Sequence, residues 1–236
     1  MRAGPRYSGE VRAIVVVLLA LVAAQAGWAA DGEPKKALTA KGKAIAQSIV
    51  LKRGDLSAAF TPSRRPDDDL PAGARCDALD ESDLTIVGEA ESPDFQLTQP
   101  GIYVTVGSTA NVYRTLREAT TSWARGTSAQ TATCFADIVR LSAPKGQRVD
   151  IVSAKRLTFP RLAPKTAVFR VVATLTISGS RVRAYIDAIV MQDGRIQSGV
   201  VFTSLGRPVG RTDQLGIAAV VAERMAKAGV PKGPTA

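Results

Sequence analysis

The second half of the chain alternates apolar and polar side chains over four successive stretches. Residues 148–159, 166–177, 181–191 and 195–204 each follow this two-residue period, which is the period of a β-strand with one face on a core and the other in water. Short turn-forming segments join the stretches, among them Asp193-Gly194, a pair typical of two-residue hairpins. The pattern predicts four antiparallel strands in a meander.

The remaining elements mix helical and extended patterns. Apolar residues recur at three- and four-residue steps in 35–51, from Ser108 through Trp123, in 127–142 and in 212–228, which predicts four helices. Extended stretches occur at 84–90, 95–97 and 102–106. Together the elements predict an α+β fold, in which an antiparallel β-meander sheet has helices packed on its apolar face.

The segments outside these elements set the domain boundaries. Residues 55–75 are rich in proline and charge and predict an extended loop, and the last residues, 231–236, predict a flexible tail. A chain of about two hundred residues is long enough for one domain with its own core. We therefore expect a single domain over residues 30–236.

The first residues have the pattern of a secretory signal peptide. Arg2, Arg6 and Arg12 precede an apolar run at 13–24, and small residues allow cleavage after Ala26 or Ala29. The alternative, a retained membrane anchor, is disfavoured because the run is shorter than the roughly 20 residues that cross a bilayer. No cysteine follows the run to form a lipobox, so residues 1–29 predict a secreted protein with a cleaved leader.

Two cysteines, Cys76 and Cys134, are the only ones in the chain. In an exported protein they are expected to form a disulfide, because oxidising compartments let such bonds persist. The alternative is a pair of free thiols in a redox or metal site. The chain has no C-x-x-C spacing and no histidine to support it.

The absence of histidine also limits the chemistry. It excludes Ser-His-Asp and Cys-His nucleophiles and histidine zinc sites, and the chain contains neither a G-x-S-x-G nor a P-loop motif. The run Asp67–Asp69 lacks the spacing of a calcium loop. We expect no catalytic residues, no metal and no cofactor.

The charge of the chain is basic but diffuse. The net charge is +10, and removal of residues 1–29 leaves +8. Basic residues interleaved with aromatic ones are missing, so we expect no nucleic-acid partner. Attraction to an acidic cell-envelope surface is one use of such a charge outside the membrane, and solubility alone is the other. The sequence defines no oligomeric state.

The polar face of the predicted meander contains the candidate site. Its residues fall on polar positions of neighbouring strands, so they should lie close together. They are Arg170, Arg181, Arg183, Tyr185, Asp187, Arg195 and Gln197. Arginines beside a tyrosine and an aspartate can hold a carboxylate or phosphate through paired donors. The alternative is a solvated sheet face, which is common in antiparallel sheets.

The order of elements resembles a known group of exported domains. The matching stretches are Gly54–Leu56, Cys76, 84–90, Ser92–Phe95, Val112–Thr115, Cys134–Ala136 and Leu215–Met225. They are similar to the extracellular sensor domains of mycobacterial serine/threonine kinases and to related small surface lipoproteins. The resemblance implies a curved antiparallel sheet with helices and disulfide support. This chain departs from those proteins in having one predicted disulfide, no kinase domain and no lipobox, so no ligand residues are transferred.

These observations predict a secreted, non-catalytic binding protein for a small amphipathic or anionic ligand. Two alternatives remain: an enzyme that works without histidine, and a structural or interaction protein of the cell surface. A binding protein should have a pocket with convergent polar groups, and an enzyme a buried carboxylate or lysine with a shifted pKa. An interaction protein should have a broad exposed apolar patch.

Overall fold

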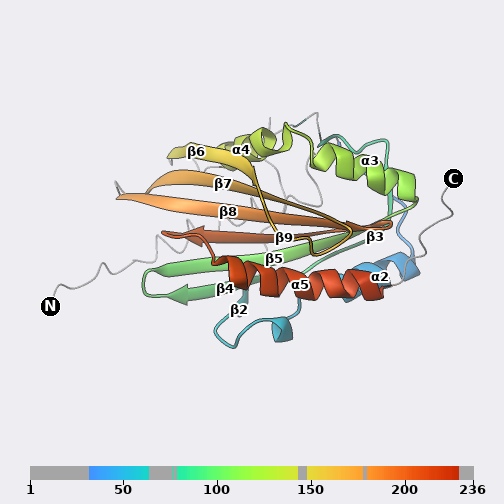
Figure 1. The fold of residues 1–236 in the computed structure, drawn as a ribbon, viewed down its shortest axis with the longest axis horizontal. Helices are drawn as coiled ribbons and strands as arrows, with labels where there is room; N and C mark the ends of the chain where they lie inside the picture. The colour runs from blue at the N-terminus through green and yellow to red at the C-terminus, as the bar shows by residue number, and fades with distance from the viewer. Residues whose placement is uncertain (1–31, 64–75, 77–78, 143–147, 178–179, 229–236) are drawn as a thin grey trace.

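The computed structural model describes residues 32–63, 76, 79–142, 148–177 and 180–228 (Figure 1). The predicted signal peptide at 1–29, the tail at 231–236 and the run Asp67–Asp69 lie outside these residues, as does most of the predicted loop at 55–75. No helix in the described part of the chain is both long and apolar enough to span a bilayer.

The described residues form nine strands, four α-helices and one short 3₁₀ helix. In chain order they are β1 (Lys35–Lys36), α2 (Ala40–Ile49), η1 (Arg53–Asp55), β2 (Thr61–Ser63), β3 (Thr85–Glu91), β4 (Asp94–Gln99), β5 (Ile102–Tyr113), α3 (Leu116–Gly126), α4 (Thr131–Leu141), β6 (Arg148–Leu157), β7 (Lys165–Ile177), β8 (Ser180–Asp193), β9 (Ile196–Leu205) and α5 (Arg211–Lys227). This composition confirms the α+β class. The four strands and the last helix lie within two residues of their predicted bounds.

The sheet is more than the predicted meander. Its order is β1-β3-β5-β9-β8-β7-β6, with β4 paired to β5 and β2 paired to β4. The last four strands do form a meander, but β1 pairs parallel to β3, so the expectation of a purely antiparallel sheet is wrong. The two strands are parallel because the connection between them contains α2, which lets the chain return before β3 and run in the same direction as β1.

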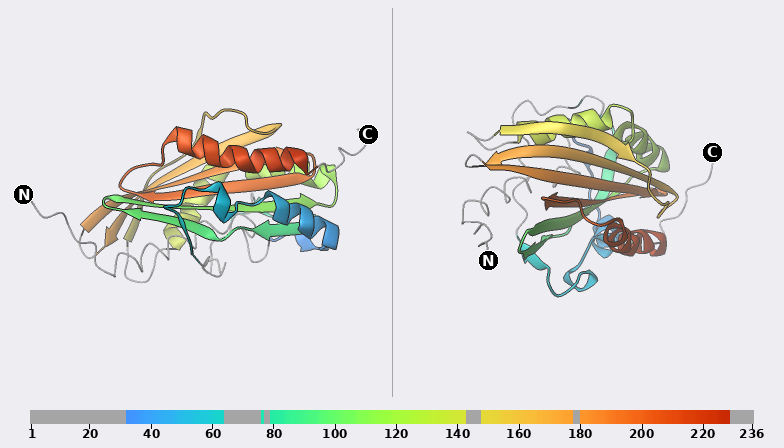
Figure 2. Two further views of the ribbon diagram at one scale, coloured as in Figure 1. Left: turned by 90° about the horizontal axis from the view of Figure 1, so that it is seen from below. Right: turned by 60° about the vertical axis from the view of Figure 1, so that its left-hand side comes forward.

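Helices cover both faces of the sheet rather than one. α4 packs on one face against Phe169 of β7 and Ile186 of β8. α2 and α5 pack on the other, against Val168 of β7 and Ile189 of β8. Figures 1 and 2 show α5 along one side of the strands and α3 and α4 on the other. The prediction of one apolar face was incomplete because these central strands bury side chains on both sides.

The helix expected from Ser108 begins eight residues later, at Leu116. β5 continues through Tyr113, since it pairs with β9 over ten residues from Tyr103 to Val112. The helix α3 starts after Thr115, whose side chain accepts from the backbone N–H of Glu118 while the Glu118 carboxylate accepts from the N–H of Thr115. This capping box satisfies two backbone donors that would otherwise lack partners.

Backbone contact holds α2 on β3. A Cβ atom added to Gly42 would lie 2.0 Å from the carbonyl oxygen of Val87, and one added to Gly88 would lie 2.1 Å from that of Gly42. Glycine at both positions therefore lets the helix approach the strand closely. The contact places Ala46 and Ile49, both fully buried, in the core beneath α5.

Candidate functional site

A cavity of about 80 Å³ lies between the sheet and the layer formed by α3, α4 and the loop before β3. Its floor comes from β5 and β9, and Phe135 of α4 and Phe169 of β7 supply aromatic walls. Glu81, from the loop, is the one charged side chain among the described residues that line it. The volume exceeds what a single water needs but is below the 300–1,000 Å³ typical of drug-sized ligands, so the cavity has room for a small group only.

Four polar side chains form a hydrogen-bond network at this cavity. Tyr113 Oη donates to Glu81 Oε2 at 2.9 Å and lies 2.7 Å from Ser122 Oγ. Ser122 Oγ also contacts Glu81 Oε1 and lies 3.2 Å from Gln197 Oε1. The amide nitrogen of Gln197 donates to the carbonyl oxygen of Ala119 at 2.6 Å, which joins β9 to α3.

Protonated Glu81 satisfies three of the four oxygen–oxygen contacts among these side chains, whereas the carboxylate satisfies two. Ser122 has a single hydrogen to donate, while Glu81 and Gln197 both present it an oxygen. If Glu81 is protonated, its carboxyl group donates to Ser122, and Ser122 donates to Gln197. Burial raises the pKa of Glu81, against the hydrogen bonds from Ser122 and Tyr113, which lower it. The cavity therefore favours protonated Glu81 more than water does.

The side chain of Asn111 is the unsatisfied member of the cavity. Asn111 lies opposite Gln197 in the β5–β9 register and is 9% exposed. Its Oδ1 is buried and has no hydrogen-bond partner. A buried acceptor without a partner costs about 1–3 kcal/mol, and a ligand that donates to it removes this cost.

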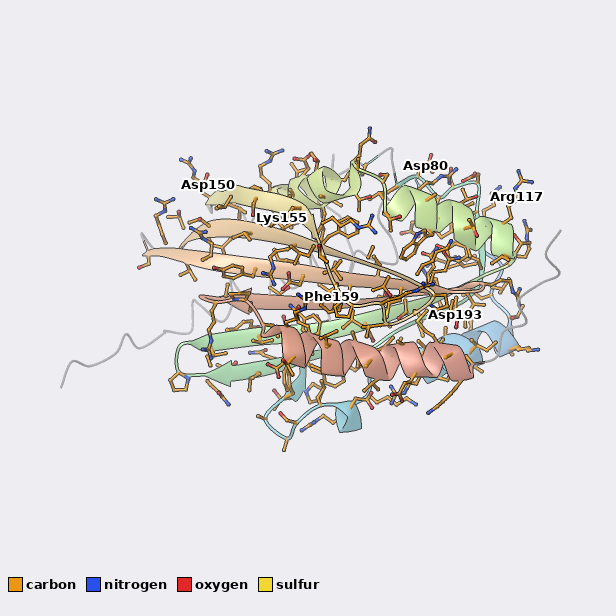
Figure 3. The ribbon with its side chains drawn as sticks, viewed as in Figure 1. Asp80, Arg117, Asp150, Lys155, Phe159 and Asp193 are labelled. Atoms are coloured by element: carbon orange, nitrogen blue, oxygen red, sulfur yellow. A yellow bond between two sulfur atoms is a disulfide. The ribbon has the colours of Figure 1, made fainter. Side chains whose placement is uncertain are left out.

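Two separate links hold the loop that carries Glu81. Cys76 and Cys134 form the disulfide that the sequence predicted, with Cα atoms 5.7 Å apart, and it ties the start of the loop to α4. Arg125 of α3 donates to both carboxylate oxygens of Asp83, at 2.5 and 3.0 Å, and to the carbonyl oxygen of Asp80 at 2.7 Å. Figure 3 shows Asp80 beside α3. The loop is thus fixed to both helices that roof the cavity.

Five of the seven predicted site residues share one face of β7 and β8. Arg170 forms a two-pronged ion pair with Asp187, at 2.5 and 2.9 Å, and the Gln214 amide of α5 donates to the same aspartate at 2.6 Å. Asp187 is 1% exposed, so this pair is part of the packing under α5. On the same face, beyond that pair along β8, Arg181 and Arg183 are exposed and Tyr185 is partly buried.

The structure separates the other two residues from that group. Arg195 donates to the backbone carbonyl of Arg114 at 2.7 Å, just before α3. Gln197 points to the opposite side of the sheet, into the cavity described above. The predicted seven-residue surface is thus divided between two faces and one strand end.

Sequence reasoning missed most of the cavity. Only Gln197 was named, whereas Glu81, Asn111, Tyr113 and Ser122 were not. The sequence analysis placed Asn111 and Tyr113 in a helix, in which side chains two positions apart point in different directions. That prediction concealed the fact that both side chains lie on the same face of a strand. The available signal was the alternation of 109, 111 and 113, which puts polar residues on one side of a strand.

A larger, more open groove of about 710 Å³ lies on the α5 side. It runs between η1, the β4–β5 hairpin and the start of α5, and its walls include Phe60, Val104 and Ile217. Asp55 at its edge already pairs with Arg224, at 2.6 and 2.7 Å. None of the partnerless buried polar atoms found in the described residues lines this groove, so the smaller cavity is the better candidate site.

No known protein family matches the chain, and no curated protein matches it. One similar solved structure is the extracellular domain of PknH from Mycobacterium tuberculosis, with 10% identity over 80% of this chain and 97% of that chain and a TM-score of 0.41. Another is LpqN, involved in cell envelope biogenesis of Mycobacterium tuberculosis, with 10% identity over 70% and 87% and a TM-score of 0.28. The resemblance to exported mycobacterial domains drawn from the sequence agrees with both. At these TM-scores neither match bears on the cavity or its ligand.

Proposed function

We propose that this protein is a non-catalytic binding domain that acts outside the cytoplasm and holds a small ligand in the cavity at Glu81. The observation that carries the proposal is the buried Asn111 Oδ1, which faces the cavity without a partner. Around it, four other polar side chains converge and two phenylalanines supply an apolar wall. This combination is typical of small-molecule sites. The disulfide supports an oxidising compartment.

The charge of the cavity selects between the two predicted ligand classes. Its described lining contains a carboxyl group and no arginine or lysine. An anionic ligand would meet no opposite charge there, and burial of an unpaired charge is costly. The cavity therefore favours an amphipathic ligand without negative charge. The exposed Arg181 and Arg183 remain the place where an anion or an acidic envelope surface would bind.

The test is native mass spectrometry of the protein purified from its secretion host. We expect a ligand mass on the wild-type protein and its loss in Asn111→Leu, which keeps the side-chain size but removes the acceptor. Arg183→Ala is the matched control on the distant face and should retain the ligand. Loss in Arg183→Ala with retention in Asn111→Leu would instead place the site on the basic face.

An enzyme is the second candidate, and Glu81 is the observation that favours it. Glu81 is a buried carboxyl group with a raised pKa, and it contacts the hydroxyl of Ser122. Only the ionised form of Glu81 accepts the proton of Ser122, and in that form the pair can activate the serine for acyl transfer. Hydrolysis of p-nitrophenyl acetate that disappears in both Ser122→Ala and Glu81→Gln would establish this reaction and overturn the non-catalytic proposal.

The third class, an interaction protein of the cell surface, has less support. For a protein of this class we expected a broad exposed apolar patch. Within the described residues, the large hydrophobic side chains that are exposed are Leu141 and Val152, at 44% and 51%. They belong to α4 and β6, and two side chains do not make a broad patch.

A further inference from the structure

The hydrogen-bond network at the cavity contains fewer hydrogens than its contacts require. Four oxygen–oxygen contacts join the side chains of Glu81, Tyr113, Ser122 and Gln197, and each contact needs one hydrogen between its two oxygens. Tyr113 and Ser122 supply one hydrogen each. Two contacts therefore lack a hydrogen when Glu81 is ionised, and one still lacks it when Glu81 is protonated. The network is short of donors in both states.

Asn111 adds another acceptor to this network. Its Oδ1 atom is buried and has no partner, and Gln197 lies directly opposite it in the β5–β9 register. The amide nitrogen of Gln197 donates to the Ala119 carbonyl, so the amide oxygen is the atom left toward Ser122. Directly opposed residues have Cβ atoms about 5 Å apart. One small ligand group can therefore reach both amide oxygens.

The described lining of the cavity also lacks a cation to pair with Glu81. Glu81 is the one charged side chain in that lining, and burial raises its pKa. The positive charge of Arg125 acts in the opposite direction on this pKa, but the Arg125 guanidinium donates to Asp83 and to the Asp80 carbonyl. A buried carboxylate without a partner is costly. A cation bound in the cavity would therefore stabilise the ionised form of Glu81.

These properties select the chemistry of the bound group. A carboxylate or carbonyl only accepts hydrogen bonds and would add to the shortage of donors, whereas a hydroxyl donates one hydrogen. A primary ammonium group donates three, accepts none and has the charge opposite to that of ionised Glu81. Such a group is about the size of a water molecule, whose share of liquid volume is about 30 Å³. The cavity of about 80 Å³ thus has room for the group and the first carbons of its chain, beside Phe135 and Phe169.

We propose that the cavity binds the ammonium group of a small primary amine. Ionised Glu81 is its counter-ion, and the side-chain oxygens of Asn111 and Gln197 accept its remaining hydrogens. This proposal deepens the proposed function and rests on it. It names the donor that the buried Asn111 oxygen lacks, and it agrees with the exclusion of negatively charged ligands from the cavity.

The test is an NMR titration of the purified protein with three probes of similar size: ethylammonium chloride, ethanol and sodium acetate. The signals to follow are the side-chain amides of Asn111 and Gln197. The Gln214 amide is the control signal, because it donates to Asp187 on the opposite face of the sheet. We expect ethylammonium to shift the first two signals to saturation, with a Kd in the millimolar range typical of so small a ligand. Potassium chloride at equal ionic strength should leave all three unchanged.

The variant Glu81→Gln tests the counter-ion. It keeps the shape of the side chain and removes the charge, so it should weaken ethylammonium binding roughly tenfold to a hundredfold, the loss of a charged hydrogen bond. Glu223→Gln is the matched control, since Glu223 is an exposed carboxylate of α5 and its loss changes the net charge equally. It should bind as the wild type does. An unchanged Gln214 signal shows that each variant is folded.

The outcomes separate this proposal from the proposed function. Equal affinity for ethylammonium in wild type and Glu81→Gln overturns the ammonium proposal, as does saturation by ethanol, acetate or potassium at the same concentrations. No shift with any probe overturns it too. The proposed function still holds in these cases if the native protein carries a ligand mass that Asn111→Leu loses. If that mass is also absent, both proposals are wrong.

Discussion

The contact between α2 and β3 gives the sharpest prediction about stability, through the variant Gly88→Ala. The added Cβ would lie 2.1 Å from the Gly42 carbonyl oxygen, whereas ordinary contacts begin at 3.4 Å. The helix must therefore move away from the strand by about 1.3 Å. Such a shift disturbs Ala46 and Ile49, which are fully buried one and two turns further along the helix.

The expected magnitude follows from these contacts. Overpacking a well-packed core costs about 1–3 kcal/mol, and partial exposure of Ile49 adds a share of the roughly 1.5–3 kcal/mol that its burial contributes. We expect Gly88→Ala to lose about 3 kcal/mol. For a protein of this size that lowers the melting temperature by roughly 6–12 °C.

The assay is urea unfolding followed by circular dichroism, with Gly216→Ala as the control. A Cβ on Gly216 would meet nothing within 4 Å, and Gly216 lies inside α5. Alanine there should stabilise by about 0.5–1 kcal/mol. Gly42→Ala should resemble Gly88→Ala, and the two losses should not add because both break one contact. A change below about 0.5 kcal/mol in Gly88→Ala would refute the reasoning.

Three further results are expected. Because the pKa of Glu81 is raised in the folded protein, its contribution to the free energy of unfolding is fully present below its ordinary pKa, near 4.5, and is lost as pH rises through the raised value. Unfolding curves of Glu81→Gln measured across pH should not show this loss of stability. Asp187→Ala leaves Arg170 without its partner under α5 and should cost about 3–5 kcal/mol, whereas Arg183→Ala at the exposed end should cost less than about 0.5 kcal/mol in the same denaturant assay. Cys134→Ser should lose about 2–5 kcal/mol, and two titratable thiols in the denatured wild-type protein would contradict the disulfide.

Local periodicity predicted much of the fold. The strands β6 to β9 follow a two-residue alternation, and their hairpins are short, so their boundaries were close to those observed. β5 was predicted to end at Val106, because the stretch from Gly107 to Ala110 consists of small residues that do not alternate clearly. This segment is a strand since it pairs with β9, and that pairing joins residues about ninety positions apart.

The candidate site was harder to predict for a related reason. Glu81, Tyr113 and Gln197 come from a loop and two strands that are distant in sequence. No local spacing connects them. The arginines named from the sequence were correctly placed on polar positions, but one of them, Arg170, forms an ion pair covered by a helix whose position the pattern did not specify.

The disulfide has a consequence for when the loop that carries Glu81 is fixed in place. Cys76 lies three residues before Leu79, which lines the cavity, and five before Glu81. The bond therefore joins this wall of the cavity to α4. A chain with reduced thiols lacks that tether, so its cavity wall is held by Arg125, by the hydrogen bonds of Glu81 and by the strand pairing of β3. Under the proposed function, ligand binding would therefore depend on oxidation of the two cysteines, and a newly made molecule in a reducing compartment would have the cavity residues without the covalent tether.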